Sequence, residues 1–386
     1  MSELTRTQIQ SLRMRALALT GPAESSPGGA RTARPTVASI VQWFGAMQAQ
    51  DLASGLWSFG ARIAGTVESD ITDALERKEA LRTWPMRGTV HFVPPRDAKW
   101  MVDLMGVKPL AGAAKRREFL GMTEATTELA VDTLRIVLAG GKRLSRAQCL
   151  EALADAGIET ASQVGYHLLW YASQKGVTCV APHVGKDQTF VLLDEYVPDP
   201  HLPERDEALA IMALRYVRGH GPVTDKEMAR WTGLGVRDCR TGIALARSDG
   251  TLTEVQTELG PMLVTAELAE SAGGTGTPAD RAEYLVLPGF DEYMLGYGDR
   301  SLMLDPEGFQ HVVPGNNGVF RSTLVRDGRV LGTWKRTLRA KSCLIDAVPL
   351  GLGARGKITA SDRAAFEAAF KPYGAFVGKP AEVVWA

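Results

Sequence analysis

Residues 82–93 read Arg82-Thr83-Trp84-Pro85-Met86-Arg87-Gly88-Thr89-Val90-His91-Phe92-Val93. Apolar and polar side chains alternate along this stretch with the period of two that is typical of β-strands, so we interpret it as a hairpin. One face takes Trp84, Met86, Val90 and Phe92, and the other takes Thr83, Arg87, Thr89 and His91. Helical patterns at about 5–19, 36–47 and 69–79 precede it. Three helices followed by a hairpin is the order of a winged helix.

The second of these helices ends in a run of polar residues. Thr36 is its expected N-cap, and Val37, Ile40, Val41, Phe44 and Met47 form one apolar stripe. We expect the helix to end within Met47-Gln48-Ala49-Gln50-Asp51, before Gly55 breaks the pattern. Three polar side chains therefore stand just beyond a buried helix face.

The same order of elements recurs twice further along the chain. Ser145-Arg146-Ala147-Gln148 and Thr224-Asp225-Lys226-Glu227 are capping boxes, and each opens a short helix that is followed by another helix and two strands. A repeat of this kind predicts a tandem array of winged-helix (helix-turn-helix) motifs. We place the three units at residues 1–125, 126–200 and 201–280.

A C-terminal segment with a different sequence pattern follows a Gly/Thr-rich linker at Ser271–Pro278. Its predicted strands and helix are Tyr284–Leu287, Ser322–Arg326, Arg329–Thr333, Ser342–Val348 and Ser361–Phe370. Asp327-Gly328, between two of the strands, is a strong signal for a tight hairpin. Residues 281–386 are therefore expected to form a small antiparallel β-barrel with one helix, and the whole chain is expected to be of the α+β class.

The composition excludes several classes of protein. The 44 basic and 44 acidic side chains among 386 residues cancel, so a surface for nucleic acid has to come from local segregation of charge. No apolar run approaches the roughly 20 residues of a membrane span, and the N-terminus lacks a secretory signal. The four cysteines stand far apart, which argues against disulfides and a structural zinc site. We expect a cytoplasmic protein with no metal, no cofactor and no membrane partner.

Several segments, taken together, resemble one known family. They are Met47–Asp51, Arg82–Phe92, Gly221-Pro222-Val223-Thr224 with Arg230-Trp231-Thr232-Gly233-Leu234, Leu287-Pro288-Gly289-Phe290-Asp291-Glu292-Tyr293, and Gly332-Thr333-Trp334-Lys335. This combination is similar to the winged-helix DNA-binding family of the bacterial AlkZ and YcaQ DNA glycosylases. The resemblance extends from about residue 5 to residue 384.

The resemblance implies a monofunctional DNA glycosylase that hydrolyses the N-glycosidic bond of bulky N7-alkylated purines or interstrand crosslinks in double-stranded DNA. It also implies winged helices and a β-barrel arranged as a C-shaped clamp, acting as a monomer in repair or in self-resistance to a genotoxic natural product. The catalytic motif of AlkZ-like members is Gln-x-Gln, which corresponds here to Gln48-Ala49-Gln50. YcaQ-like members carry Asp at the second position, so these residues favour the AlkZ-like side.

The chemistry of such a reaction suits two amides. Alkylation at N7 makes the purine a good leaving group, so the enzyme has to stabilise an oxocarbenium-like sugar and hold a water molecule rather than supply an acid. Each glutamine offers a carbonyl acceptor and an NH₂ donor for this purpose. The alternative for Gln48 and Gln50 is an ordinary polar end to a buried helix.

Further site residues are expected on basic and acidic segments. The candidates for DNA binding are Arg82, Arg87 and His91 on the hairpin, Lys115, Arg116 and Arg117, and Lys335, Arg336 and Arg339 near the C-terminus. The candidates for a cleft carboxylate that places water are Asp51, Asp291 and Glu292. The alternatives are solvated cations and loop carboxylates that bind backbone.

Two other functions compete with the enzyme. A non-catalytic winged-helix transcription regulator would use its third helices to read bases, but residues 163–175 and 237–247 are poor in base-reading side chains, which favours the enzyme weakly. A protein that sequesters a small genotoxin would instead need an apolar pocket and no DNA.

Overall fold

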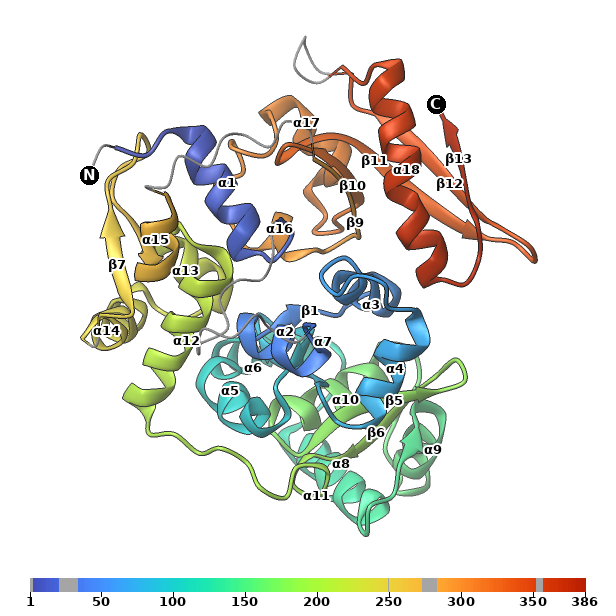
Figure 1. The fold of residues 1–386 in the computed structure, drawn as a ribbon. Helices are drawn as coiled ribbons and strands as arrows, with labels where there is room; N and C mark the ends of the chain where they lie inside the picture. Colours follow the sequence, from blue (N-terminus) through green and yellow to red (C-terminus); the bar gives the residue numbers. More distant parts are fainter. Residues whose placement is uncertain (1–2, 21–33, 249, 273–282, 352–356) are drawn as a thin grey trace.

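The computed structural model describes residues 3–20, 34–248, 250–272, 283–351 and 357–386 (Figure 1). Most of the linker predicted at Ser271–Pro278 lies outside these ranges. The described residues form a mixed α+β fold, and one hydrophobic cluster runs from the N-terminal helices to the C-terminal helix. The predicted class is confirmed at this level.

The N-terminal part has helices before a hairpin, as predicted. Its elements are α1 (Arg6–Ala16), α2 (Val37–Phe44), β1 (Met47–Gln48), α3 (Leu52–Gly60), α4 (Glu68–Glu76), β2 (Leu81–Met86) and β3 (Thr89–Val93). Thr36 caps α2, since its hydroxyl accepts from the backbone N–H of Ser39 at 3.1 Å. Arg87 and Gly88 form the turn of the hairpin, with φ values of 55° and 71°.

The predicted end of α2 is wrong. Gly45 adopts a φ of 78°, which stops the helix at Phe44, so Met47 does not belong to the helical stripe. Met47 and Gln48 form strand β1 instead, and the polar residues of the motif follow a strand rather than a helix.

Gly55 does not break a helix, because it lies within α3. Asp51 begins this helix, and its Oδ2 accepts from the backbone N–H of Ser54 at 3.0 Å. A Cβ atom on Gly55 would lie 2.8 Å from the ring of Phe92 on β3. The glycine therefore permits close packing of α3 on the strand.

Both predicted capping boxes are present. Gln148 accepts from Ser145 N–H at 2.8 Å, and Glu227 accepts from Thr224 N–H at 3.0 Å. The elements around them are α8 (Glu124–Leu138), β4 (Leu144–Ser145), α9 (Arg146–Asp155), α10 (Gln163–Gln174), β5 (Thr178–Val184), β6 (Asp187–Leu192), α12 (Arg205–His220), α13 (Asp225–Thr232), α14 (Val236–Arg247), β7 (Leu252–Val255) and β8 (Met262–Thr265).

The first two hairpins share one six-stranded sheet of order β1-β3-β2-β5-β6-β4, in which β2 meets β5 at Arg82 and Val180. Strands β7 and β8 form a separate two-stranded sheet. Because β2 lies between β3 and β5 and packs against α10, all six of its residues are buried. Both the apolar and the polar face predicted for the first hairpin are therefore buried along β2.

The C-terminal part does not form the predicted antiparallel barrel. Its strands β9 (Tyr284–Leu287), β10 (Ser322–Arg326), β11 (Arg329–Leu338), β12 (Cys343–Pro349) and β13 (Ala381–Trp385) form an open sheet of order β13-β12-β11-β10-β9. Strand β13 pairs with β12 in parallel, because helix α18 (Ala360–Phe376) provides the crossover between them. Among the described residues, β9 and β13 do not pair, so the sheet stays open.

Several elements were not predicted. They are β1, α3, β4, η1 (Pro95–Asp97), α5 (Ala98–Met105), α6 (Val107–Gly112), α7 (Ala114–Phe119), α11 (Leu193–Tyr196), α15 (Ala266–Ala272), α16 (Glu292–Leu295), α17 (Pro306–Val312), η2 (Pro314–Asn316) and β13. Helix α3 packs against α18 (Figure 1), and the start of α3, where the glutamine motif ends, lies close to the C-terminal sheet. Within the described ranges, no helix is long and apolar enough to cross a lipid bilayer.

Candidate active site

The glutamine motif is extended and fixed along one edge of the six-stranded sheet. Gln48 on β1 pairs with His91 on β3, and Ala49 N–H donates to Val90 O at 2.9 Å. Gln48 ends strand β1, and Gln50 lies in the bend that follows, where its side chain contacts the backbone of β3 at Val90.

The two amide groups keep free hydrogen-bonding capacity. Gln48 is 8% exposed, and its Oε1 accepts from Ala49 N–H at 3.3 Å. Gln50 is exposed, and its Oε1 accepts from Val90 N–H at 3.4 Å. Neither side-chain nitrogen donates to another described residue, and neither is sealed from solvent. The unused donors therefore belong to a nearly buried amide at Gln48 and to an exposed one at Gln50.

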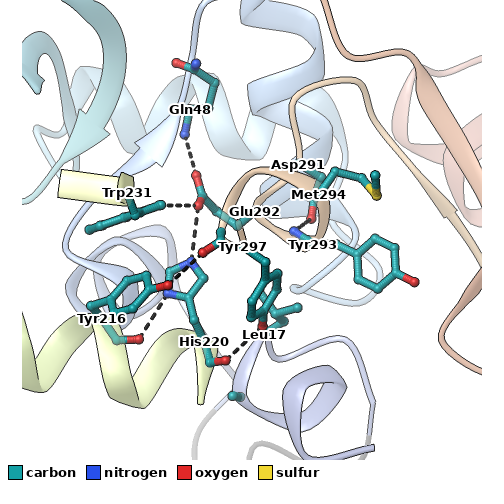
Figure 2. A network of polar contacts seen from close by, with 12 residues as sticks. Leu17, Gln48, Tyr216, His220, Trp231, Asp291, Glu292, Tyr293, Met294 and Tyr297 are labelled. Atoms are coloured by element: carbon teal, nitrogen blue, oxygen red, sulfur yellow. Dashed lines mark hydrogen bonds and ion pairs between the residues drawn. The ribbon is translucent and has the colours of Figure 1, made fainter. Parts of the chain in front are cut away.

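Glu292 lies directly beneath Gln48 and holds its backbone (Figure 2). Its Oε1 accepts from Gln48 N–H at 3.1 Å. Its Oε2 accepts from the Trp231 indole at 2.9 Å and contacts His220 Nε2 at 3.2 Å. Glu292 is 1% exposed, so a fully buried carboxylate anchors the strand that carries the motif.

His220 is surrounded by acceptors. Its Nε2 faces Glu292, and its Nδ1 lies 3.1 Å from the backbone carbonyl of Tyr216. Both neighbours are acceptors, so whichever ring nitrogen carries a proton can donate to one of them. The ring stacks on Tyr216 and packs against Trp231, with centroid separations of 4.7 Å and 5.2 Å. The histidine and the glutamate thus form a fully buried polar contact.

The electrostatics of this cluster keep Glu292 ionised. Burial by itself raises the pKa of Glu292, but the hydrogen bond and charge of His220, the Trp231 indole and the nearby Arg87 together lower its pKa to about 2. Glu292 is therefore a permanent acceptor for the Gln48 backbone at neutral pH. It does not face open solvent, so the predicted role of placing a cleft water is wrong for this residue.

Asp291 has a structural role. Its two oxygens accept from the Arg62 guanidinium at 2.8 Å and 2.9 Å, and one of them also accepts from Ser58 at 2.8 Å. Asp291 also caps α16 through Tyr293 N–H. With 1% exposure and all these partners, it is not a cleft carboxylate, and the alternative of a loop carboxylate is the better description.

The hairpin residues predicted to contact phosphates are largely enclosed. His91 is completely buried, and burial together with Arg87 lowers its pKa to about 3, so it is neutral. Arg82 is 5% exposed, and burial lowers its pKa to about 10. These two predictions of a surface contact are wrong, because the hairpin is an interior strand pair. Arg87 is half-buried and lies 3.2 Å from His91 Nε2.

The other predicted cations remain accessible to different degrees. Lys115 is exposed on α7, and Arg116 and Arg117 beside it are half-buried. Lys335 and Arg336 on β11 line a cavity together with Asp51, so the structure brings these three predicted site residues together. Arg339 directly follows the end of β11, and its guanidinium lies 3.9 Å from the Glu382 carboxylate.

The sequence did not identify three buried residues, His220, Trp231 and Arg62, that support the glutamine motif. His220, Trp231 and Arg62 are separated from Gln48 in the chain and follow no local pattern of their own. The only signal was proximity to segments that carry the family resemblance, because Trp231 lies inside one of them and His220 directly precedes another.

The chain belongs to the AlkZ-like DNA glycosylase family, whose family model matches residues 41–376. It is therefore an enzyme that acts on N-glycosyl bonds, and this membership favours the glycosylase over a transcription regulator. An interstrand DNA cross-link repair glycosylase from Streptomyces sahachiroi is 27% identical over 311 residues, which cover 78% of this chain and 82% of that protein. The solved structure of the S. sahachiroi DNA glycosylase AlkZ has the same fold, with a TM-score of 0.78 and 23% identity, covering 99% of this chain and 100% of that one.

Proposed function

We propose that this glycosylase removes bulky N7-alkylated purines from double-stranded DNA and unhooks interstrand crosslinks, with Gln48 and Gln50 as its catalytic residues. The pair of accessible amides on an anchored strand carries the proposal. The name of the S. sahachiroi relative, an interstrand DNA cross-link repair glycosylase, supports the choice of substrate class.

The reaction needs few groups from the protein. The C1′–N9 bond breaks with its electrons passing to the cationic purine, which leaves an oxocarbenium-like sugar, and a water oxygen then bonds to C1′ and loses its proton to solvent. The carbonyl oxygens of Gln48 and Gln50 accept from that water and face the positive sugar, while their NH₂ groups donate to oxygens of the nucleotide. Glu292 acts through the backbone by keeping Gln48 in place.

The domain arrangement that we propose is the one implied by the resemblance to the same family. Three winged helices within residues 1–125, 126–200 and 201–280, with the C-terminal unit at 281–386, would form a C-shaped clamp in which Lys115, Arg116, Arg117, Lys335, Arg336 and Arg339 contact phosphates. We further propose that the protein acts as a monomer in the cytoplasm and without a cofactor.

The products of the reaction test the proposal. A duplex with one N7-methylguanine, and a second with an N7–N7 interstrand crosslink, are incubated with excess enzyme. Mass spectrometry should detect the released base, alkali should cleave the strand at the abasic site, and borohydride should trap no protein–DNA adduct. Absence of base release from both duplexes, with tight binding to one unmodified sequence, would instead indicate a regulator.

A further inference from the structure

A cavity of about 460 Å³ opens beside the glutamine motif, and its volume is within the range of roughly 300–1,000 Å³ that is usual for sites of small ligands. Its lining comes from the start of α3, the turn at Pro288–Phe290 before α16, and strands β10, β11 and β12. Asp51, the residue that directly follows Gln50, is part of the wall. The cavity therefore begins one residue beyond the glutamine motif.

Five aromatic residues line this cavity, namely Trp57, Phe290, Phe320, Trp334 and Tyr373. Phe290 and Phe320 are half-buried, whereas the other three are nearly enclosed. The two indole N–H groups are already bonded, to Val286 O at 2.8 Å and to Leu287 O at 3.0 Å. The Tyr373 ring lies 4.9 Å from Trp57 and 5.0 Å from Trp334. This wall is held rigidly and offers ring surface rather than free hydrogen-bonding groups.

The mouth of the cavity includes a strained aromatic residue. Phe290 has a φ of 60°, a left-handed conformation that bulky residues rarely adopt. The turn is tightly packed, since a Cβ atom on Gly289 would lie 2.6 Å from the carbonyl oxygen of Phe320. The rings of Phe290 and Phe320 consequently lie 6.3 Å apart, centroid to centroid. Strain of this kind persists where the surroundings impose it, which often happens at binding sites.

Charged side chains complete the lining. The cations are Arg321, Lys335 and Arg336, and the carboxylates are Asp51 and Asp346. Arg321 and Lys335 are exposed, whereas Arg336 is half-buried and donates to the Tyr373 hydroxyl at 3.1 Å. An aromatic wall with accessible cations is the combination by which proteins stack a base while holding the nucleic-acid backbone.

We propose that this cavity binds a planar aromatic ring of the DNA lesion while the sugar of the same nucleotide lies at Gln48 and Gln50. The inference rests on the proposed function, because the lesion is the ligand. The ring belongs either to the substituent on N7 or to the purine itself, and the chemistry of stacking is the same for both.

The test compares binding of three 2′-fluorinated duplexes, whose glycosidic bonds resist cleavage. One carries N7-methylguanine, one carries N7-benzylguanine, and one is undamaged. Val348→Trp fills the cavity from β12, where Val348 is 42% exposed and lines the wall. Val384→Trp is the matched control, since Val384 is 54% exposed on the neighbouring strand and does not line the cavity. Phe290→Asn removes one ring and keeps a residue that tolerates the left-handed backbone.

We expect the wild type to bind the benzyl duplex about tenfold more tightly than the methyl duplex. Val348→Trp and Phe290→Asn should abolish this preference, and Val384→Trp should keep it, which would identify the substituent as the ring. An equal loss for both lesions relative to undamaged DNA would identify the purine. Unchanged binding in Val348→Trp and Phe290→Asn would overturn the inference. Excision of N7-methylguanine from the unfluorinated duplex, measured separately, decides the proposed function in either case.

Discussion

The backbone N–H of Gln48 donates to Glu292 Oε1 across 3.1 Å, so a carboxylate 244 positions further along the chain holds the strand that carries the glutamine motif. Glu292 is in turn fixed by His220 and Trp231, which come from α12 and α13 (Figure 2). Side chains from α12, α13 and α16 thus meet beneath the backbone N–H of Gln48. The position of Gln48 depends on this cluster rather than on a contact to its own side chain.

Replacing Glu292 with glutamine should slow base excision without preventing DNA binding. The amide oxygen of the substituted side chain would still accept from Gln48 N–H, but the charge that pairs with His220 would be lost, and the strand would be held less firmly. For Glu292→Gln we expect a loss of about tenfold in the single-turnover rate, in line with a displacement of catalytic groups, and little change in the dissociation constant for DNA. Glu151→Gln, on the exposed face of α9, is the control. Parallel losses in rate and in DNA affinity would show a general loss of structure instead.

The Glu292 carboxylate should stabilise the folded protein at neutral pH, and this contribution should be lost in acid. Its pKa is about 2 in the folded protein against an ordinary value of 4.5, so the unfolded chain binds the proton first. The stabilisation is complete above about pH 4.5 and is lost as the pH falls from there through about 2. Urea titrations at several pH values should therefore show a steeper fall in the free energy of unfolding for the wild type than for Glu292→Gln. Equal slopes would contradict the assignment of the buried anion.

Breaking the pair of Arg62 and Asp291 should destabilise the fold strongly. Both side chains are almost fully enclosed and share two hydrogen bonds, so Arg62→Met leaves an unpaired buried carboxylate. We expect a loss of about 3–5 kcal/mol in the free energy of unfolding, with partial recovery in Arg62→Met/Asp291→Asn. Chemical denaturation of the single and double variants measures both effects. A single variant within about 1 kcal/mol of the wild type would mean that the pair is weaker than its geometry indicates.

Two helical glycines should respond in opposite directions to alanine. Gly55→Ala places a Cβ 2.8 Å from the Phe92 ring and should cost about 1–3 kcal/mol. Gly112→Ala, in α6, meets no described atom within 4 Å and should gain about 0.5–1 kcal/mol. Thermal unfolding of the two variants compares them directly. If both variants were stabilised, the tight packing of α3 against β3 would be disproved.

Local patterns predicted much of the fold. Strands β9 and β10 have the predicted bounds, and both capping boxes begin helices where expected, because alternation and capping depend on residues close in the chain. The end of α2 was misplaced because Met47 continues the apolar period of the helix, although Gly45 had already stopped it. The open sheet was misjudged because the parallel strand β13 returns through α18, and such a pairing leaves no local trace.

The candidate site was likewise predicted only in part from the sequence. The glutamine motif was identified by its resemblance to a family, and the structure places its first glutamine in strand β1 beside His91 on β3. His91 and Arg82 were misplaced because alternation predicts one solvated face, whereas the partners on both sides of β2 and the helices packed on it bury the hairpin. The contact between Glu292 and His220 joins residues 72 positions apart, and no periodicity along the chain predicts it.

The central claim is that the Gln48 and Gln50 amides carry the chemistry. Single-turnover excision of N7-methylguanine, or of a bulkier N7 lesion if methyl is a poor substrate, is measured for Gln48→Ala, Gln50→Ala and the control Gln42→Ala, an exposed glutamine on α2. Loss of a group preorganised around the transition state costs about 10²–10³-fold in rate, so we predict that loss for each motif variant and none for the control. Motif variants that excise the lesion within about twofold of the control would contradict the account.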